Sequence, residues 1–125
     1  MKFTHQILWV ADNKLSEKFY KKLGFEIIKS SEDVSQARLG DFVLELVTIR
    51  DEDEFTRDSM SGDKGRGVYI CLQSDDVDAE FNKFSNTKYE IAKPPRDWPW
   101  GRREFVVKDP DGYKICIWQP TKGDE

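Results

Sequence analysis

The chain has 125 residues, of which 38% are hydrophobic, 13% aromatic and 35% charged, and its formal net charge is −4 at pH 7. This balance fits an ordinary soluble globular protein of one domain, and its surplus of rings predicts a cavity or an interface. The basic residues are scattered among acidic ones, so we expect no nucleic-acid partner. No apolar segment resembles a signal peptide or a membrane span, so we expect a cytoplasmic protein that does not bind a membrane.

The first half of the chain predicts a strand, a helix and three further strands. Alternation at 3–10 indicates a strand with His5 and Trp9 on one face. Apolar residues at helical spacing predict a helix over 14–23, which Gly24 would terminate in the left-handed conformation. The strands expected next lie at 25–29, 36–39 and 42–48.

The second half repeats this order after a charged segment. The acidic run at 51–54 is typical of a solvated loop. The elements expected after it are a strand over 68–73, a helix that follows Asp75 and Asp76 and carries Val77, Phe81 and Phe84, a short strand at 88–92, and strands at 102–108 and 113–118. We therefore predict a single domain over 1–125, made of module 1 at about 1–49, a linker at about 50–66 and module 2 at about 67–120.

The repeat sets the expected fold class. Neither half can cover its own sheet, so we expect an α+β fold in which two βαβββ modules form curled, mainly antiparallel sheets around a shared groove. A proline-rich stretch with Trp98 and Trp100 is expected as a long loop at the rim of that groove. Exposed indoles in a loop favour a ligand-binding wall, with packing on a partner chain as the alternative.

Several motifs carry a family resemblance that spans nearly the whole chain. Segments 5–10, 19–25 and 109–113 resemble the glyoxalase, bleomycin-resistance and extradiol-dioxygenase superfamily, also called vicinal oxygen chelate proteins. The run Pro-Trp-Gly-Arg-Arg-Glu-Phe at 99–105 is most similar to the bleomycin-resistance branch. The resemblance implies a groove between curled sheets and, commonly, a homodimer.

The resemblance also implies where a metal would bind. Metal-using members place ligands near the start and in the last strand of each module, and those places here hold His5, Glu45, Tyr69 and Cys116. The enzymes usually carry His, Glu, His or Gln, and Glu, so this chain keeps the first pair and departs at the second. A neutral tyrosine is a poor ligand, although a Cys116 thiolate could complete a His/Glu/Cys set for zinc.

We therefore expect no cofactor and no metal, with a divalent metal on His5, Glu45 and Cys116 as the open alternative. Without metal, His5 and Glu45 would form a hydrogen-bonded pair near Tyr69. Cys71 and Cys116 match no disulfide or metal framework and are expected to be small buried thiols in a reducing compartment. Cysteine catalysis with His5 as base is a weaker possibility.

The groove is expected to hold a small molecule. Alternation from the His5 and Glu45 positions would put Ile7, Val43, Val47 and Cys71 on the same surface. The ligand-binding residues expected from all these arguments are His5, Trp9, Glu45, Tyr69, Gln73, Trp98, Trp100, Cys116 and Trp118. The function predicted is a metal-free dimeric module that binds or sequesters a small aromatic or cationic compound, as in antibiotic resistance; the alternative is a metal-dependent lyase, isomerase or dioxygenase with an atypical ligand set.

Overall fold

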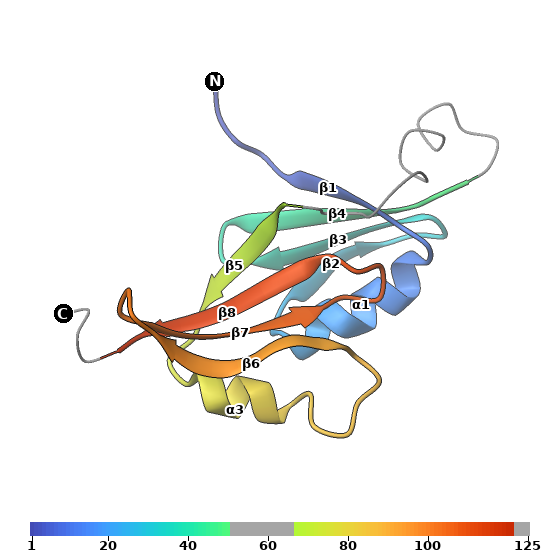
Figure 1. Cartoon of the computed structure of the whole chain (residues 1–125). Helices are drawn as coiled ribbons and strands as arrows, with labels where there is room; N and C mark the ends of the chain where they lie inside the picture. The colour runs from blue at the N-terminus through green and yellow to red at the C-terminus, as the bar shows by residue number, and fades with distance from the viewer. Residues whose placement is uncertain (51–66, 122–125) are drawn as a thin grey trace. The chain divides into compact units, whose positions relative to one another are not determined.

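The protein folds as two compact units, Met1–Gly62 and Asp63–Glu125, in a computed structural model that describes residues 1–50 and 67–121. Each unit is a βαβββ module whose four strands form a mixed, open sheet, as the repeat predicts (Figure 1). The predicted linker from residue 51 onward and its acidic run lie outside the described residues. Neither helix of the described residues is long and apolar enough to cross a membrane.

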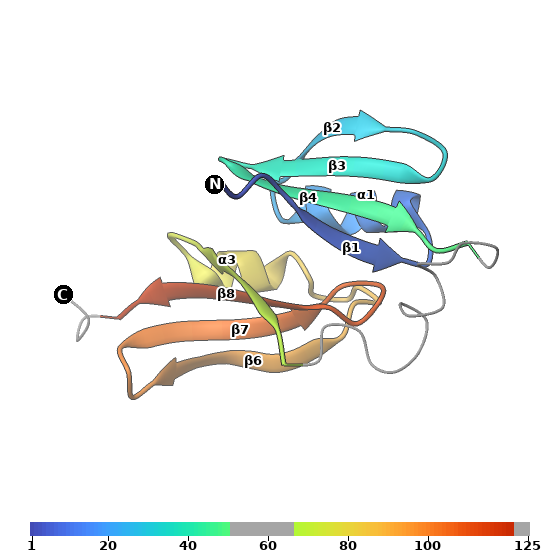
Figure 2. The same cartoon turned by 90° about the horizontal axis from the view of Figure 1, so that it is seen from above.

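The first unit is a sheet with one helix on it. Its strands lie in the order β1-β4-β3-β2, with β1 and β4 parallel and the other pairs antiparallel (Figure 2). The elements are β1 (Gln6–Val10), α1 (Asn13–Lys22), β2 (Glu26–Ser30), β3 (Val34–Leu39) and β4 (Phe42–Thr48). The predicted first strand is therefore shorter at its start, so that His5 lies just before β1.

Local sequence explains where α1 begins and ends. The Asp12 side chain accepts a hydrogen bond from the Lys14 backbone N–H at 2.9 Å, which caps the first turn. Gly24 has φ +96°, a conformation that glycine adopts at little cost, and it turns the chain into β2 as predicted. Between these ends, the helix buries Phe19 and Tyr20 completely, so one face of the sheet becomes core.

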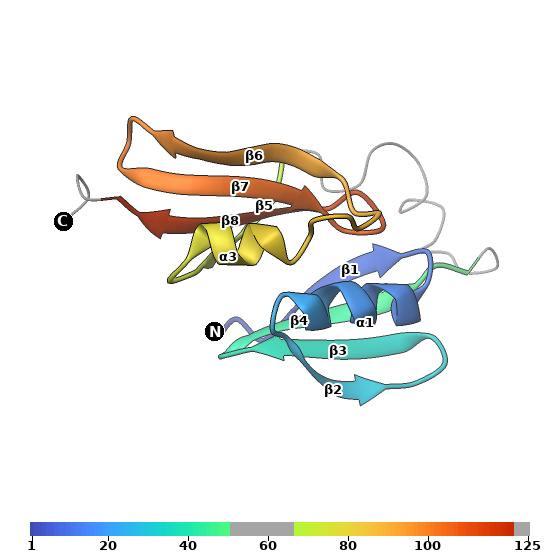
Figure 3. The same cartoon turned by 90° about the horizontal axis from the view of Figure 1, so that it is seen from below.

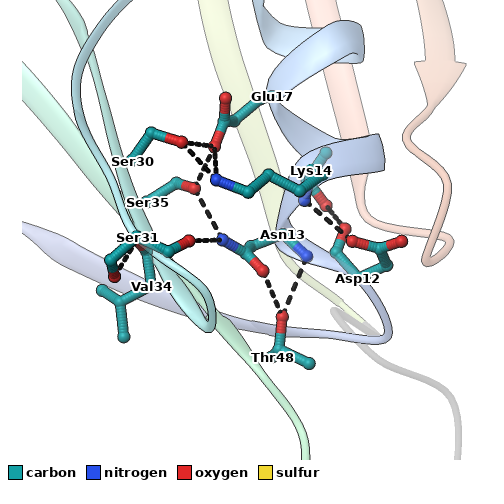
Figure 4. A network of polar contacts seen from close by, with 10 residues as sticks. Asp12, Asn13, Lys14, Glu17, Ser30, Ser31, Val34, Ser35 and Thr48 are labelled. Atoms are coloured by element: carbon teal, nitrogen blue, oxygen red, sulfur yellow. Dashed lines mark hydrogen bonds and ion pairs between the residues drawn. The ribbon is translucent and has the colours of Figure 1, made fainter.

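A buried polar network joins α1 to the sheet (Figure 4). Asn13 is 1% exposed, and its side-chain nitrogen donates to Ser35 Oγ at 2.8 Å and to the Ser31 carbonyl at 3.2 Å. Thr48 Oγ1 accepts from the Asn13 backbone N–H and donates to Asn13 Oδ1 at 2.6 Å. One helix-start residue thereby fixes strands β3 and β4, a role that the periodicity of the sequence gives no sign of.

The second unit repeats the plan. Its elements are β5 (Tyr69–Gln73), α3 (Val77–Asn82), β6 (Ile91–Trp98), β7 (Arg102–Lys108) and β8 (Lys114–Pro120). The strand order is β5-β8-β7-β6, with β5 and β8 parallel. The helix α3 lies against one face of this sheet (Figure 3), where Arg103 on β7 donates to Asp78 on α3 at 3.0 Å. Asp76 caps α3 as predicted, whereas Phe84 lies beyond its end.

The largest difference from the prediction is in β6. The strand expected at 88–92 is the longer β6, which continues through Pro94 and Pro95 to Trp98. Proline is tolerated because β6 is an edge strand, and the register with β7 shifts between Lys93 and Arg96, where the prolines lie. The tryptophan stretch is therefore mostly a strand and a tight turn rather than a long loop.

Candidate functional site

In the first unit, the predicted pair of His5 and Glu45 meets on the face of the sheet away from α1. His5 Nε2 lies 3.7 Å from Glu45 Oε2, and the Gln36 side-chain nitrogen donates to Glu45 Oε1 at 3.1 Å. Register explains the meeting, because Glu45 pairs with Ile7 on β1 and with Gln36 on β3. Gln36 was missed by the sequence analysis, although its period-two spacing from residues on the same face is a usable signal.

His5 and Glu45 alone provide too few ligands for a catalytic metal site. A catalytic metal needs about three good ligands and an open position. His5 and Glu45 supply two, and the third neighbour, Gln36, turns its N–H donor toward the carboxylate. Within the described part of either unit, no three His, Cys, Asp or Glu side chains are grouped to hold an ion. We therefore derive no chemical step through a metal.

The remaining first-unit residues follow the predicted alternation. On β1, Leu8 and Val10 are buried at 3% and 0% exposure, while Ile7 is 46% exposed and Trp9 is half-buried. The strand therefore turns Ile7 and Trp9 to the same side as His5, away from the helix. Ile7 is a surface residue rather than core, and this side of the sheet offers apolar area beside the His5 and Glu45 pair.

In the second unit, aromatic and basic side chains gather on the face of the sheet opposite α3, which we call the aromatic face. Register and alternation place Tyr69, Gln73, Trp98, Trp118 and Cys116 there. Trp100, in the turn between β6 and β7, belongs to the same group because it stacks on Trp98. Six of the nine predicted ligand-binding residues thus lie on this one face.

The two loop tryptophans of the prediction form a stack. The rings of Trp98 and Trp100 are parallel to within 9°, with centroids 4.8 Å apart. Arg96 lies against Trp98 with its Cζ atom 4.0 Å from the ring centroid, and Trp100 is 59% exposed. Trp98 therefore contacts both Arg96 and Trp100, whereas the more exposed Trp100 has ring surface available for a planar ligand.

Basic side chains lie over the other rings of the aromatic face. The Arg102 guanidinium is 3.9 Å from the centroid of Trp118, and Lys114 Nζ is 5.5 Å from the ring of Tyr69. Lys93 Nζ lies 5.7 Å from Tyr69, although the two residues come from the opposite edge strands β6 and β5. The contact between Lys93 and Tyr69 spans the two central strands, β8 and β7. Long side chains from the two edge strands therefore meet above the middle of the sheet.

Glu104 is the acidic side chain that register places among these groups. It accepts a hydrogen bond from Trp100 Nε1 at 3.3 Å and contacts the thiol of Cys116. Burial, the negative charge of Glu104 and the neighbouring Cys71 raise the pKa of the Cys116 thiol to about 12. Without a metal beside it, Cys116 is therefore a neutral thiol at physiological pH, which weakens its case as a nucleophile.

The charges around the aromatic face set which ligands it can hold. Among the residues of this unit that the structure describes, four basic residues, Lys93, Arg96, Arg102 and Lys114, lie within cation–π distance of its rings, and the carboxylate of Glu104 accepts a bond from Trp100. Such cations keep outward N–H donors that can pair with an anion. The face thus combines stacking surfaces with a positive local field.

The predicted site residues therefore fall into two described groups. His5, Trp9 and Glu45 lie on the first unit, and the six others lie on the second. The grouping of all nine around a shared groove stays a prediction. The sequence analysis missed the basic residues of the aromatic face. Period two assigns Arg102 on β7 and Lys114 on β8 to this face, whereas Lys93 and Arg96 lie on either side of a register shift in β6.

Comparison with known proteins agrees with the resemblance. The sequence model of the Glyoxalase/Bleomycin resistance protein/Dioxygenase superfamily matches residues 2–117. A hypothetical protein from Staphylococcus aureus has a similar structure, with a TM-score of 0.81, 22% identity and coverage of 95% of this chain and 94% of that chain. A search of curated proteins finds no match.

Two further solved structures have the same fold. A glyoxalase/bleomycin resistance protein/dioxygenase from Nocardioides gives a TM-score of 0.73 at 19% identity, with 98% of this chain and 86% of that chain covered. A lactoylglutathione lyase from Agrobacterium tumefaciens gives a TM-score of 0.69 at 19% identity, with 94% and 92% covered. With a family match over almost its entire length and this fold in both units, the chain belongs to the Glyoxalase/Bleomycin resistance protein/Dioxygenase superfamily.

Proposed function

We propose that this protein is a binding module that holds a small aromatic compound on the aromatic face without making or breaking bonds in it. The observation that carries the proposal is the Trp98 and Trp100 stack, whose outer ring is 59% exposed. A large exposed indole that is already oriented by a second ring and by Glu104 costs little entropy to use in binding. Stacking would supply affinity, and Gln73 and Tyr69 would help to orient the ligand.

The charges favour an acidic aromatic compound over the cationic one that the sequence also suggested. A cation on the aromatic face would lie near four basic residues and have one carboxylate, Glu104, as partner. A carboxylate or sulfonate could instead pair with the guanidinium of Arg102 or Arg96. Members of this superfamily differ widely in what they bind, so the assignment depends on these side chains and not on the fold.

The absence of a chemical step in the proposal follows from the donors available. The first unit offers His5 and Glu45, and the second offers a thiol, Cys116, that is held neutral. The alternative of a metal-dependent lyase, isomerase or dioxygenase on His5, Glu45 and Cys116 would need ligands from both units. Metal analysis of the purified protein tests it: an equimolar amount of zinc that is lost in a His5→Ala variant would favour the enzyme.

Homodimer formation and a cytoplasmic location are part of the same proposal. Superfamily members commonly dimerise, and the exposed Ile7 and Trp100 are apolar surface that a second copy or a ligand would cover. Sedimentation of the purified protein, with and without the Trp100→Ala change, measures whether these residues act at an interface.

Tryptophan fluorescence tests the binding function directly. The protein would be titrated with bleomycin-type compounds and with planar aromatic acids and their neutral amides, such as 2-naphthoate and 2-naphthamide, and calorimetry would confirm each response. We expect saturable binding of at least one planar acid. If no compound changes the fluorescence or releases heat, and Trp100→Ala alters only dimer stability, the tryptophans serve an interface and the proposal fails.

A further inference from the structure

Two cysteines that are 45 positions apart in the sequence are direct neighbours in the fold. Cys71 on β5 and Cys116 on β8 are register partners in the parallel pair of strands, and both side chains lie on the aromatic face. Their thiols are close enough to hydrogen bond. The sequence analysis treated both as separate buried thiols, which is wrong for Cys71, because Cys71 is exposed and Cys116 is 4% exposed.

The backbone geometry suits a covalent link between them. Paired residues on neighbouring strands lie about 4.8 Å apart. A disulfide accepts Cα separations of about 4.4–6.8 Å. Since partner residues in a parallel pair project to the same side of the sheet, the sulfur atoms of Cys71 and Cys116 can meet with small side-chain rotations.

We propose that Cys71 and Cys116 form a reversible intramolecular disulfide in the middle of the aromatic face when the protein meets an oxidising low-molecular-weight disulfide. Intracellular disulfides of this kind are transient and redox-sensing rather than structural. The link would form between β5 and β8 without chain rearrangement, because both strands are already paired. It would also remove the S–H group through which Cys116 contacts Glu104.

The exposures of the two thiols set the order of the steps. The Cys71 thiolate attacks the oxidising disulfide RSSR, forms Cys71–S–SR and releases RS⁻. The Cys116 thiol then loses its proton to solvent and attacks the Cys71 sulfur, which releases the second RS⁻. In total, two cysteine thiols lose two electrons and two protons, and one RSSR becomes two RSH. Cys116 cannot act first because it is 4% exposed and the external disulfide cannot reach it, whereas the mixed disulfide on Cys71 forms directly beside it.

The difference in exposure between Cys71 and Cys116 also makes reduction of the disulfide slow. An incoming thiol can reach only the Cys71 sulfur, so the group that must leave is the Cys116 thiolate. Cys116 is 4% exposed, so water stabilises the leaving thiolate poorly and the thiolate leaves slowly. The disulfide would therefore persist after the oxidant is removed, until a strong dithiol reductant restores the two thiols.

Oxidised glutathione is the probe that tests this proposal. The native protein would be incubated with it, quenched in acid and analysed by intact mass and peptide mapping. We expect loss of the mass of two hydrogen atoms, a cross-linked pair of peptides carrying Cys71 and Cys116, and full recovery with dithiothreitol. A stable glutathione adduct on Cys71 with Cys116 still free, a disulfide between two chains, or no reaction would each overturn the proposal.

Single-residue variants test whether Cys71 attacks the oxidant first and Cys116 second. In Cys116→Ser, glutathione should remain attached to Cys71, because no second thiol can displace it. In Cys71→Ser, the remaining Cys116 should stay unmodified over the same time, since it is buried. Circular dichroism would establish that both variants are folded. If Cys116 in the Cys71→Ser protein reacts as fast as Cys71 does in the parent, the assigned order of attack is wrong.

Discussion

The indole rings of Trp98 and Trp100 stack 4.8 Å apart at the point where β6 turns into β7. Residue 98 is the last of the strand and residue 100 lies in the turn, so a proline between them positions both rings on one side. A rigid backbone at this position holds Trp100 ready for a ligand. The affinity of the aromatic face for planar compounds should therefore depend on this residue.

Replacing Trp100 by Ala is expected to weaken binding of a planar aromatic acid. Aromatic stacking contributes about 0.5–1.5 kcal/mol beyond burial, so affinity should fall about 2- to 10-fold from this source alone. Calorimetric titration of the variant with 2-naphthoate measures the change. Trp100→Phe keeps a ring and should lose less. Equal loss in both variants would show that the Nε1 bond to Glu104, and not stacking, is what matters.

Arg102 should provide selectivity for acids. Its guanidinium covers Trp118 at 3.9 Å and can pair with a ligand carboxylate. We expect Arg102→Gln to weaken binding of 2-naphthoate about 10- to 150-fold, since a charge-assisted hydrogen bond contributes about 1.5–3 kcal/mol, and to leave 2-naphthamide binding nearly unchanged. Arg38→Gln, on the other unit and paired with Glu26, is the matched control. A similar loss for acid and amide would instead assign Arg102 a packing role.

Most of the fold could be predicted from the alternation of apolar and polar residues in the strands and from the capping residues of the helices. The strand at 42–48 is β4 residue for residue. Asp76 caps the start of α3 with its side chain, and Gly24 follows the end of α1 in the left-handed conformation. The strand β6 was not predictable by the same rules. Pro94 and Pro95 indicate a loop unless it is known that β6 lies at the edge of the sheet, and edge position is a property of the complete sheet.

For the candidate site, the sequence predicted which residues share a face of a sheet but not which residues are neighbours on adjacent strands. The family resemblance singled out His5, Glu45, Tyr69 and Cys116, and period two then assigned Trp9 and Trp118 to the same faces. Which residues become neighbours across strands depends on register, and register between β5 and β8 is set by packing of segments far apart in sequence. For this reason the Cys71 and Cys116 pair, and the contacts of the basic residues with the rings, became visible only in the fold.

Asn13 should be a strong determinant of stability. Its side chain donates to Ser35 and to the Ser31 carbonyl and accepts from Thr48, and truncation would remove these three buried or partly buried bonds. We expect Asn13→Ala to lower the free energy of unfolding by about 1–3 kcal/mol in urea denaturation. Asn82→Ala, at an exposed position at the end of α3, should change it by less than about 0.5 kcal/mol. Comparable losses in the two variants would contradict the role of the network.

Glu17 adjoins the same network and makes stability depend on acid pH. Its carboxylate is 8% exposed and accepts hydrogen bonds from Ser35 and Ser30, with Lys14 beside it (Figure 4). Burial alone would raise the pKa of Glu17, but the hydrogen bonds and the Lys14 charge together outweigh burial and lower it. The ionised carboxylate is therefore the form that the folded state favours.

A depressed pKa of Glu17 in the folded state contributes stability that is complete above the unfolded-state value of about 4.3 and is lost as pH falls through the folded-state value. We expect urea unfolding to show a steeper loss of stability below about pH 4.3 in the parent protein than in Glu17→Gln, which cannot titrate there. Glu32→Gln is the matched control, because the Glu32 side chain is 90% exposed, and its profile should follow the parent. If Glu17→Gln and the parent lose stability in parallel between pH 7 and the acid limit of folding, Glu17 is not the group that couples protonation to unfolding.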